Sequence, residues 1–308
     1  MPSQTLSGIT VLDLTSYIAG PFGATLLGDL GANVIKVESP SGDMMRNYPS
    51  TLVGESRAYV GVNRNKRGIV IDLKSKDGLE VIRRLIKKSD VIVHNFRPGV
   101  SRRLGLEYEQ LIDINPKIIY CGLTGFGEKG PMAGNPGFDQ VLQSLTGISK
   151  AQGALENKPH VVWGSVVDYY SSSLLAMAVC AALYEREKTK VGKAVSVSLY
   201  DAALSSLVNQ ASNYLMGGKV PQRIGSLHPN IAPYGEIFTT KDKALITFAI
   251  GSDRHFSKFC TTLKLNSLPT DERFISNQNR VRNRTVLAEL IQEKVSEHSC
   301  VELLNALQ

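Results

Sequence analysis

Asp168 is the carboxylate in this sequence whose surroundings best suit covalent chemistry. It follows the apolar, small-residue run Trp163 to Val167 and precedes a helical pattern over residues 169–186. A carboxylate at a helix start in apolar surroundings can be both held and desolvated, as a nucleophilic aspartate requires. An aspartate at such a position is more often a helix N-cap. The residues alone leave both interpretations open.

Arginine side chains gather after the strand-like run over residues 90–93. The segment Asn95 to Gly99 ends that run, and Arg102 and Arg103 follow one turn later. Guanidinium groups at the carboxyl edge of a parallel sheet can bind an anionic ligand. A solvated loop with ordinary surface arginines is an equally good explanation. The same two interpretations apply to a second basic cluster, Asn63 to Arg67.

Several other functional motifs are absent from the sequence. The turn at residues 19–23 is not a GxGxxG loop, and Pro21 removes one backbone amide, so NAD binding is not expected despite the acid Glu38 after the next strand. The sequence has no Walker loop, GxSxG elbow or EF-hand, which leaves phosphoryl transfer and Ser-His-Asp hydrolysis without support. Its four cysteines and five histidines are dispersed. We therefore expect reduced thiols and no metal site.

Composition indicates an ordinary globular protein, with 43% hydrophobic and 20% charged residues. A formal net charge of +7 favours an anionic ligand. Without a basic stretch interleaved with aromatic residues, nucleic-acid binding is not expected. The apolar run Leu174 to Leu183 is too short to span a membrane, and the N-terminus carries no signal-peptide pattern. We expect a cytoplasmic protein without a membrane partner.

The elements that must position these residues alternate between strands and helices over the first two thirds of the chain. Strand-like runs cover residues 8–14, 33–37, 68–73, 90–93, 117–123 and 194–199, and helical patterns cover 21–30, 76–88, 107–112, 169–186 and 201–215. This alternation predicts an α/β fold with a parallel sheet covered on both faces.

The pattern changes after about residue 210. A hairpin is predicted over residues 234–250, followed by helices over 253–263 and 280–297. We therefore predict a large α/β domain over residues 1–210, a connector over 211–232 and a small α+β domain over 233–308. The final residues open a helical pattern that ends without a cap, Gly or Pro, and we expect the chain to be truncated there.

The sequence resembles the class III coenzyme A transferases, the CaiB/BaiF family that includes formyl-CoA transferase and succinyl-CoA:dicarboxylate CoA-transferases. The resembling segments follow the family order along nearly the whole chain: Val11 to Leu14 with Ala19 to Pro21, Leu30 to Glu38, Asn63 to Arg67, Asn95 to Gly99, Gly125 to Gly127, Pro136 to Asp139, Val167-Asp168 and Gly251 to Phe256. The resemblance implies a Rossmann-like large domain, a smaller α+β domain and an interlocked, ring-like homodimer.

By this resemblance, Asp168 is the catalytic nucleophile. It implies that CoA moves from an acyl-CoA donor to an acceptor carboxylic acid through acyl-aspartyl anhydride and aspartyl-CoA thioester intermediates, and that Gly251 belongs to an active-site loop that shields the anhydrides. The residues that it implies contact CoA are Ala19, Ile71, Asp72, Leu73, Lys74, Asn95, Phe96, Arg97, Arg103, Pro136, Gly137, Phe138 and Asp139. Arg97 and Arg103 are the residues we expect on the phosphates.

The sequence also departs from known members of the family. Ser39 and Ile18 stand where formyl-CoA transferase has Arg and Gln, which argues against formyl and oxalate chemistry. Residues 213–215, 231–234 and 279–284 most resemble the members that use dicarboxylic acids. A 2-methylacyl-CoA racemase of the same fold is one alternative, but it needs a histidine where this chain has Phe138. A non-catalytic, truncated CoA-binding protein is the other alternative.

Overall fold

The structure is a computed structural model that describes residues 4–48, 56–154, 156 and 158–307. It divides the chain into two compact units. The first unit comprises Met1–Lys150 and Val161–Pro221, and the second comprises Ala151–His160 and Gln222–Gln308. The boundary at Pro221 falls inside the segment predicted as a connector over residues 211–232, and a short stretch from the predicted large domain, residues 151–160, belongs to the second unit.

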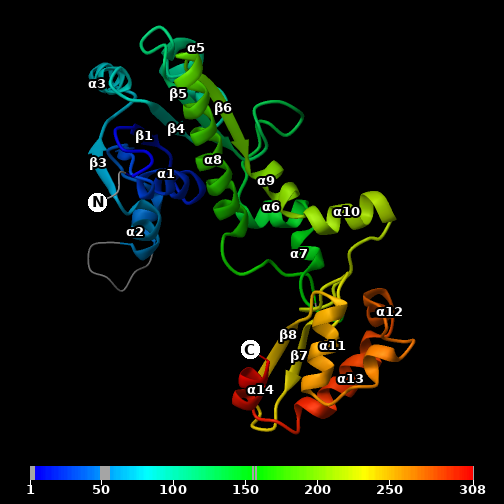
Figure 1. The fold of residues 1–308 in the computed structure, drawn as a ribbon. Helices are drawn as coiled ribbons and strands as arrows, with labels where there is room; N and C mark the ends of the chain where they lie inside the picture. Colours follow the sequence, from blue (N-terminus) through cyan, green and yellow to red (C-terminus); the bar gives the residue numbers. More distant parts are fainter. Residues whose placement is uncertain (1–3, 49–55, 155, 157, 308) are drawn as a thin grey trace. The chain divides into compact units, whose positions relative to one another are not determined.

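The first unit is built on a six-stranded sheet in the order β3-β2-β1-β4-β5-β6, in which every pair of neighbouring strands is parallel (Figure 1). Its strands are β1 (Thr10–Leu14), β2 (Asn33–Glu38), β3 (Lys66–Val70), β4 (Val91–His94), β5 (Ile119–Thr124) and β6 (Lys193–Ser198). Its helices are α1 (Ala19–Asp29), η1 (Met44–Asn47), α2 (Arg57–Asn63), α3 (Lys76–Ile86), α4 (Val100–Leu104), α5 (Tyr108–Leu111), α6 (Asp139–Leu145), α7 (Ile148–Ala151), α8 (Val166–Thr189), α9 (Leu199–Ser206) and α10 (Val208–Gly217). The predicted α/β fold with a parallel sheet is confirmed.

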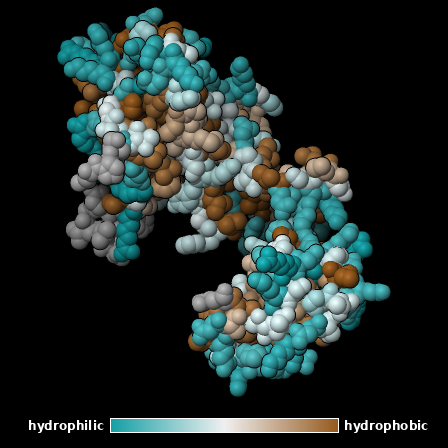
Figure 2. Space-filling model, viewed as in Figure 1, coloured by the Kyte–Doolittle hydropathy of each residue, from teal (hydrophilic) through white to brown (hydrophobic). Residues whose placement is uncertain are grey.

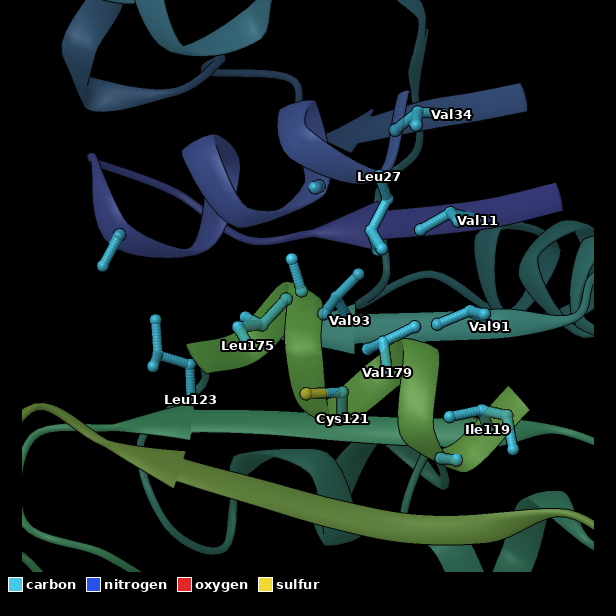
Figure 3. Close-up of a cluster of buried hydrophobic side chains, with 14 of the residues drawn as sticks. Val11, Leu27, Val34, Val91, Val93, Ile119, Cys121, Leu123, Leu175 and Val179 are labelled. Atoms are coloured by element: carbon cyan, nitrogen blue, oxygen red, sulfur yellow. The ribbon is translucent and has the colours of Figure 1, made fainter. Parts of the chain in front are cut away.

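Both faces of this sheet are covered, because successive strand residues point to opposite sides. Val11 and Val91 pack in one core with Leu27 of α1 and Val179 of α8 (Figure 3). On the other face, Leu12 and Ile92 pack with Ile82 of α3, in a second core. Within the described residues, α8 is the one helix long and apolar enough to cross a membrane, and in this structure it packs against α1 and the sheet.

Several element boundaries differ from the sequence prediction. Helix α8 begins at Val166 rather than after Asp168, because Asp139 accepts hydrogen bonds from the first-turn backbone N–H groups of Val167 and Asp168. The helix predicted over 201–215 is two helices that meet at Leu207, and the one predicted over 280–297 is two helices that meet at Asn283. Both residues leave the helical backbone region, with ψ values of 12° and 26°.

The second unit contains the predicted antiparallel hairpin and a set of helices. Its elements are β7 (Tyr234–Thr239), β8 (Leu245–Ala249), α11 (Asp253–Thr262), η2 (Leu268–Thr270), α12 (Asn277–Arg282), α13 (Arg284–Val295) and α14 (Cys300–Ala306). Its core contains phenylalanine side chains from both the strands and the helices, including Phe238, Phe248 and Phe259. The smaller α+β part of the predicted fold is therefore confirmed.

Arg280 is a buried charged side chain at the centre of the second unit. Its guanidinium donates to the carbonyl oxygens of Ala232 and Phe274, at 2.9 and 3.0 Å, and to the Asp253 carboxylate at 2.5 Å. The same group lies 4.4 Å from the ring centroid of Phe256. One side chain therefore connects α12 to α11 and to the segment before β7.

We predict that Arg280→Met lowers the free energy of unfolding of the second unit by about 3 kcal/mol, because it leaves buried acceptors without their donor. Chemical denaturation followed by circular dichroism measures the change. The exposed Arg282 on the same helix provides the control, and Arg282→Met should change stability by less than about 0.5 kcal/mol. Equal effects of the two substitutions would contradict the prediction.

Candidate active site

Two adjoining cavities open at the carboxyl edge of the sheet, beside β1 and β4, where the strand order reverses. Ligands bind at this position in doubly wound α/β folds. The larger cavity, of about 800 Å³, is lined by residues after β1, β4 and β5 and at the starts of α6 and α8. The smaller cavity, of about 550 Å³, is lined by residues after β1, β2 and β3 and by α4. Leu14, Ser16, Phe96 and Val100 line both cavities.

Asp168 lines the larger cavity from the first turn of α8. The carboxylate of Asp139 lies beside it, and its Oδ2 accepts hydrogen bonds from the backbone N–H groups of Val167 at 2.7 Å and Asp168 at 3.2 Å. These N–H groups form the positive end of the helix. Asp139 therefore occupies the donors that would otherwise be available to stabilise an anion at Asp168.

The pKa of Asp168 is raised to about 7, from 3.8, chiefly by burial and further by the negative charge of Asp139. Near neutral pH both protonation states are therefore populated. A carboxylate with this pKa is a stronger base, and a stronger nucleophile, than an exposed aspartate.

Asp139 is itself held firmly and is only 7% exposed. Its Oδ1 accepts a hydrogen bond from Nε2 of Gln143 at 2.5 Å, one turn later on α6. Gln143 Oε1 in turn accepts from the backbone N–H of Val162, in the segment that leads into α8. The side chain of Ser172 donates to the carbonyl oxygens of Asp168 and Ala19, which ties α8 to the start of α1. The position of Asp168 is thus determined by contacts from α1, α6 and α8.

The structure brings the predicted site residues of the first unit together around these two cavities. Those lining the larger cavity are Ala19, Asn95, Phe96, Arg97, Pro136, Gly137, Phe138, Asp139 and Asp168. Those lining the smaller cavity are Ile71, Asp72, Leu73, Lys74, Phe96 and Arg103. Gly251 lies between β8 and α11 in the second unit and lines neither cavity, so its role in an active-site loop stays a prediction.

The basic cluster Asn63 to Arg67 lines neither cavity. Lys66 is buried and pairs with the Asp13 carboxylate at 2.8 Å. Arg64 pairs with Asp29, and Arg67 donates to the side chain of Asn33. These cations bind groups within the first unit, so the interpretation of this cluster as an anion site is not supported.

Sequence reasoning missed Tyr17, Met45 and Tyr48, which also line the larger cavity. Tyr17 follows β1 with a φ of 69°, which is unusual for a bulky side chain. Its ring packs edge to face against Phe138, with the ring centroids 6.2 Å apart. Neither the left-handed backbone nor the aromatic pair had a signal in the sequence, because tyrosine is not a residue typical of that conformation.

Buried ion pairs lie beneath the loops that form the two cavities. Lys36 Nζ contacts Asp43 Oδ2 at 2.9 Å, and both side chains are at most 2% exposed. The signal for this pair was present in the sequence, since Lys36 interrupts the apolar run of β2. A cation inside such a strand requires a buried partner, although the sequence does not identify it.

The larger cavity also bears on the racemase alternative, which needs an imidazole beside the aspartate. Among the described residues that line the larger cavity, none is a histidine. Phe138, at the position where a racemase would need its imidazole, instead packs on Tyr17. The cavity therefore offers no observation that favours the racemase alternative.

Comparison with known proteins places these features in a family. The profile of CoA-transferase family III matches residues 6–308. The chain is 36% identical to the acetyl-CoA:oxalate CoA-transferase of Acetobacter aceti, over 99% of this chain and 79% of that protein. It is 38% identical to the succinyl-CoA:glutarate CoA-transferase of Homo sapiens, over 96% of this chain and 67% of that protein.

A crystal structure of a CaiB/BaiF family protein from Brucella suis is also similar. Its TM-score is 0.83 at 38% sequence identity, and the match covers 99% of this chain and 81% of that one. Because the sequence and structural matches extend over nearly the whole chain, the chain belongs to CoA-transferase family III and is a CoA-transferase.

Proposed function

We propose that Asp168 is the covalent nucleophile of this CoA-transferase. Its carboxylate oxygen attacks the thioester carbonyl of the acyl-CoA donor, and the C–S bond of the tetrahedral intermediate breaks to release CoA thiolate. The product on the enzyme is an acyl-aspartyl anhydride. The thiolate then attacks the aspartyl carbonyl, which releases the donor acid and leaves an aspartyl-CoA thioester.

The second half of the reaction repeats these steps in the opposite order. The acceptor carboxylate attacks the aspartyl-CoA carbonyl and expels CoA thiolate, which gives a second mixed anhydride. The thiolate then attacks the acceptor acyl carbon, forming the new thioester and restoring the Asp168 carboxylate. No bond to water forms, so the thioester is exchanged rather than hydrolysed.

The placement of Asp168 beside Asp139 is the observation that carries this proposal. The mechanism requires a carboxylate that attacks a thioester and later leaves from an anhydride. The raised pKa of Asp168 strengthens the attacking carboxylate. Asp139 contributes to this, because its charge raises the pKa and its hydrogen bonds fix the first turn of α8.

We propose that CoA occupies both cavities, with its reactive sulfur near Asp168 and its nucleotide end in the smaller cavity. Lys74 and Arg103 line the smaller cavity, and Arg97 lines the larger one near their shared wall. Phosphate groups are bound well by such cations. Phe96, which lines both cavities, provides an apolar surface at their junction.

The proposed donor is the CoA thioester of a dicarboxylic acid, and the proposed acceptor is a second dicarboxylic acid. Two of the similar proteins, from Homo sapiens and Mus musculus, are named for succinyl-CoA and glutarate, which agrees with the resemblance in the sequence. The similar protein named for acetyl-CoA and oxalate provides the competing pair. Comparing glutarate with oxalate as acceptor therefore tests this assignment directly.

We also propose that the chain forms a homodimer. Helix α10 has no buried residue, and its exposed side chains include Val208, Leu215 and Met216. Figure 2 shows hydrophobic patches on the surface of the first unit. Exposed apolar clusters of this kind are typical of protein interfaces.

We predict that wild-type protein mixed with succinyl-CoA and trapped with hydroxylamine acquires a hydroxamate at Asp168. Asp168→Ala should acquire none, because it has no carboxylate to acylate. Intact-mass measurement and peptide mapping identify the adduct. Ser173→Ala, on an exposed position of the same helix, is the control and should react like the wild type. A hydroxamate at another residue would contradict the proposal.

A further prediction concerns the pH dependence of the reaction. The carboxylate form of Asp168 is required, so kcat/KM should fall as pH decreases through about 7. Asp139→Asn keeps an oxygen that accepts from α8 but removes the charge, so the acidic limb of its profile should move to lower pH. Initial rates across the pH range provide the measurement. An unchanged limb in Asp139→Asn would show that the charge of Asp139 has no effect on the nucleophile.

Another prediction concerns the smaller cavity. Arg103→Met should raise the Kd for CoA by about tenfold or more, because a charge-assisted hydrogen bond to phosphate contributes about 1.5–3 kcal/mol. Titration calorimetry measures the affinity. The exposed Arg84 on α3 lines neither cavity, and Arg84→Met should leave the Kd unchanged. Equal affinities for the two variants would argue against this placement of the nucleotide.

A further inference from the structure

We propose that Asp43 is a positioning residue, which holds the backbone of Tyr17 in the conformation that forms the wall of the larger cavity. The inference deepens the proposed function, because it rests on the assignment of that cavity to the reacting acyl group. It concerns the acceptor oxygen Oδ1 of Asp43, which is distinct from the oxygen that pairs with Lys36.

Asp43 is only 4% exposed, and both of its carboxylate oxygens are used. Oδ2 pairs with Lys36 Nζ, as described above. Oδ1 accepts hydrogen bonds from the backbone N–H groups of Met45 at 3.0 Å and Tyr17 at 3.3 Å. The backbone N–H of Asp43 itself donates to Glu38 at 2.9 Å. Asp43 thus connects the loop after β2 to the loop after β1.

A second set of buried bonds holds the residue that begins the β1 loop. The carbonyl oxygen of Thr15 accepts from Lys36 Nζ at 2.6 Å. The Asp13 carboxylate accepts from the backbone N–H and the hydroxyl of Thr15 at 3.0 and 2.5 Å. Asp13 is in turn neutralised by Lys66. Thr15 is therefore fixed by both buried ion pairs, two residues before Tyr17.

Tyr17 needs such support because of its backbone. Its φ of 69° lies in the left-handed region, which is unfavourable for a residue with a large side chain. A conformation of this kind persists when surrounding bonds determine it. The hydrogen bond from Tyr17 N–H to Asp43 is made directly at the strained residue.

The conformation of Tyr17 determines what its side chain contributes to the cavity. The ring contacts Phe138, and both residues line the larger cavity together with Asp168. Phe138 directly precedes Asp139, which fixes the start of α8. If Tyr17 left this conformation, its ring would move away from Phe138 and the aromatic wall beside Asp168 would open. We place the acyl group that exchanges CoA at this wall.

The test compares two double variants that both remove the buried ion pair. Lys36→Met with Asp43→Asn retains an oxygen acceptor at position 43, whereas Lys36→Met with Asp43→Leu does not. Replacement of a buried ion pair by uncharged residues of similar size is often tolerated. The measurements are thermal unfolding, hydrogen exchange at the amide of Tyr17, and KM for glutarate with succinyl-CoA as donor.

We expect both variants to fold. In the Leu variant, exchange at Tyr17 should be about tenfold faster than in the Asn variant, and KM for glutarate about tenfold higher, with kcat changed by less than about threefold. Asp29→Asn, which breaks an exposed ion pair with Arg64, is the control and should match the wild type.

Equal exchange at Tyr17 in the two double variants would overturn the proposal. Faster exchange with an unchanged KM would also overturn it, since Asp43 would then serve stability alone. If wild-type protein transferred no CoA between these substrates, the proposed substrates would be wrong. The exchange comparison would still decide whether Asp43 holds Tyr17, so the two failures can be distinguished. If the Leu variant failed to unfold cooperatively, Asp43→Ala in the same Lys36→Met background would replace it, with slower exchange again expected in the Asn variant.

Discussion

The parallel direction of all strands in the large sheet is the constraint on which the site depends. It brings the loops after β1, β2, β3, β4 and β5 to one edge, although those loops are far apart in the sequence. The strand order reverses between β1 and β4, so the connections on the two sides turn away from each other and leave space there. Both cavities lie at this point, and α8 presents Asp168 to the larger one.

Forming a site at this edge requires charged groups inside an apolar sheet. Asp13 and Lys36 stand in the middle of β1 and β2, and both are at most 1% exposed. Unpaired, either charge would be very unfavourable. Paired with Lys66 and Asp43, they contribute little net stability but impose specific geometry. Burial acts differently on Asp168. Its charged neighbour is another carboxylate, Asp139, so burial and this charge both raise its pKa and the carboxylate becomes more basic.

The sequence predicted much of this arrangement and failed where contacts between distant residues decide the outcome. The alternating strand and helix patterns were sufficient to predict the parallel sheet. The family motifs were sufficient to select Asp168, Asn95 and Arg103, which line the cavities at its carboxyl edge. The sequence did not reveal that Lys66 binds Asp13, 53 residues away, so it left open whether this basic cluster is an anion site or an ordinary surface loop. Likewise, α8 begins before Asp168 because a residue from another helix, Asp139, caps it. Such bonds leave no periodic pattern in the chain.

Asp139 both fixes the position of Asp168 and makes the anion of Asp168 less stable. A carboxylate at a helix N-terminus usually stabilises a neighbouring positive charge or is itself stabilised by the helix, and a second carboxylate there is repelled. Here Asp139 takes the backbone donors of Val167 and Asp168, so its carboxylate neutralises the positive end of α8. Asp168 then remains in the same turn, fixed in position but poorly stabilised as an anion. The position of Asp168 and part of its raised pKa therefore depend on the same residue, although burial raises that pKa more.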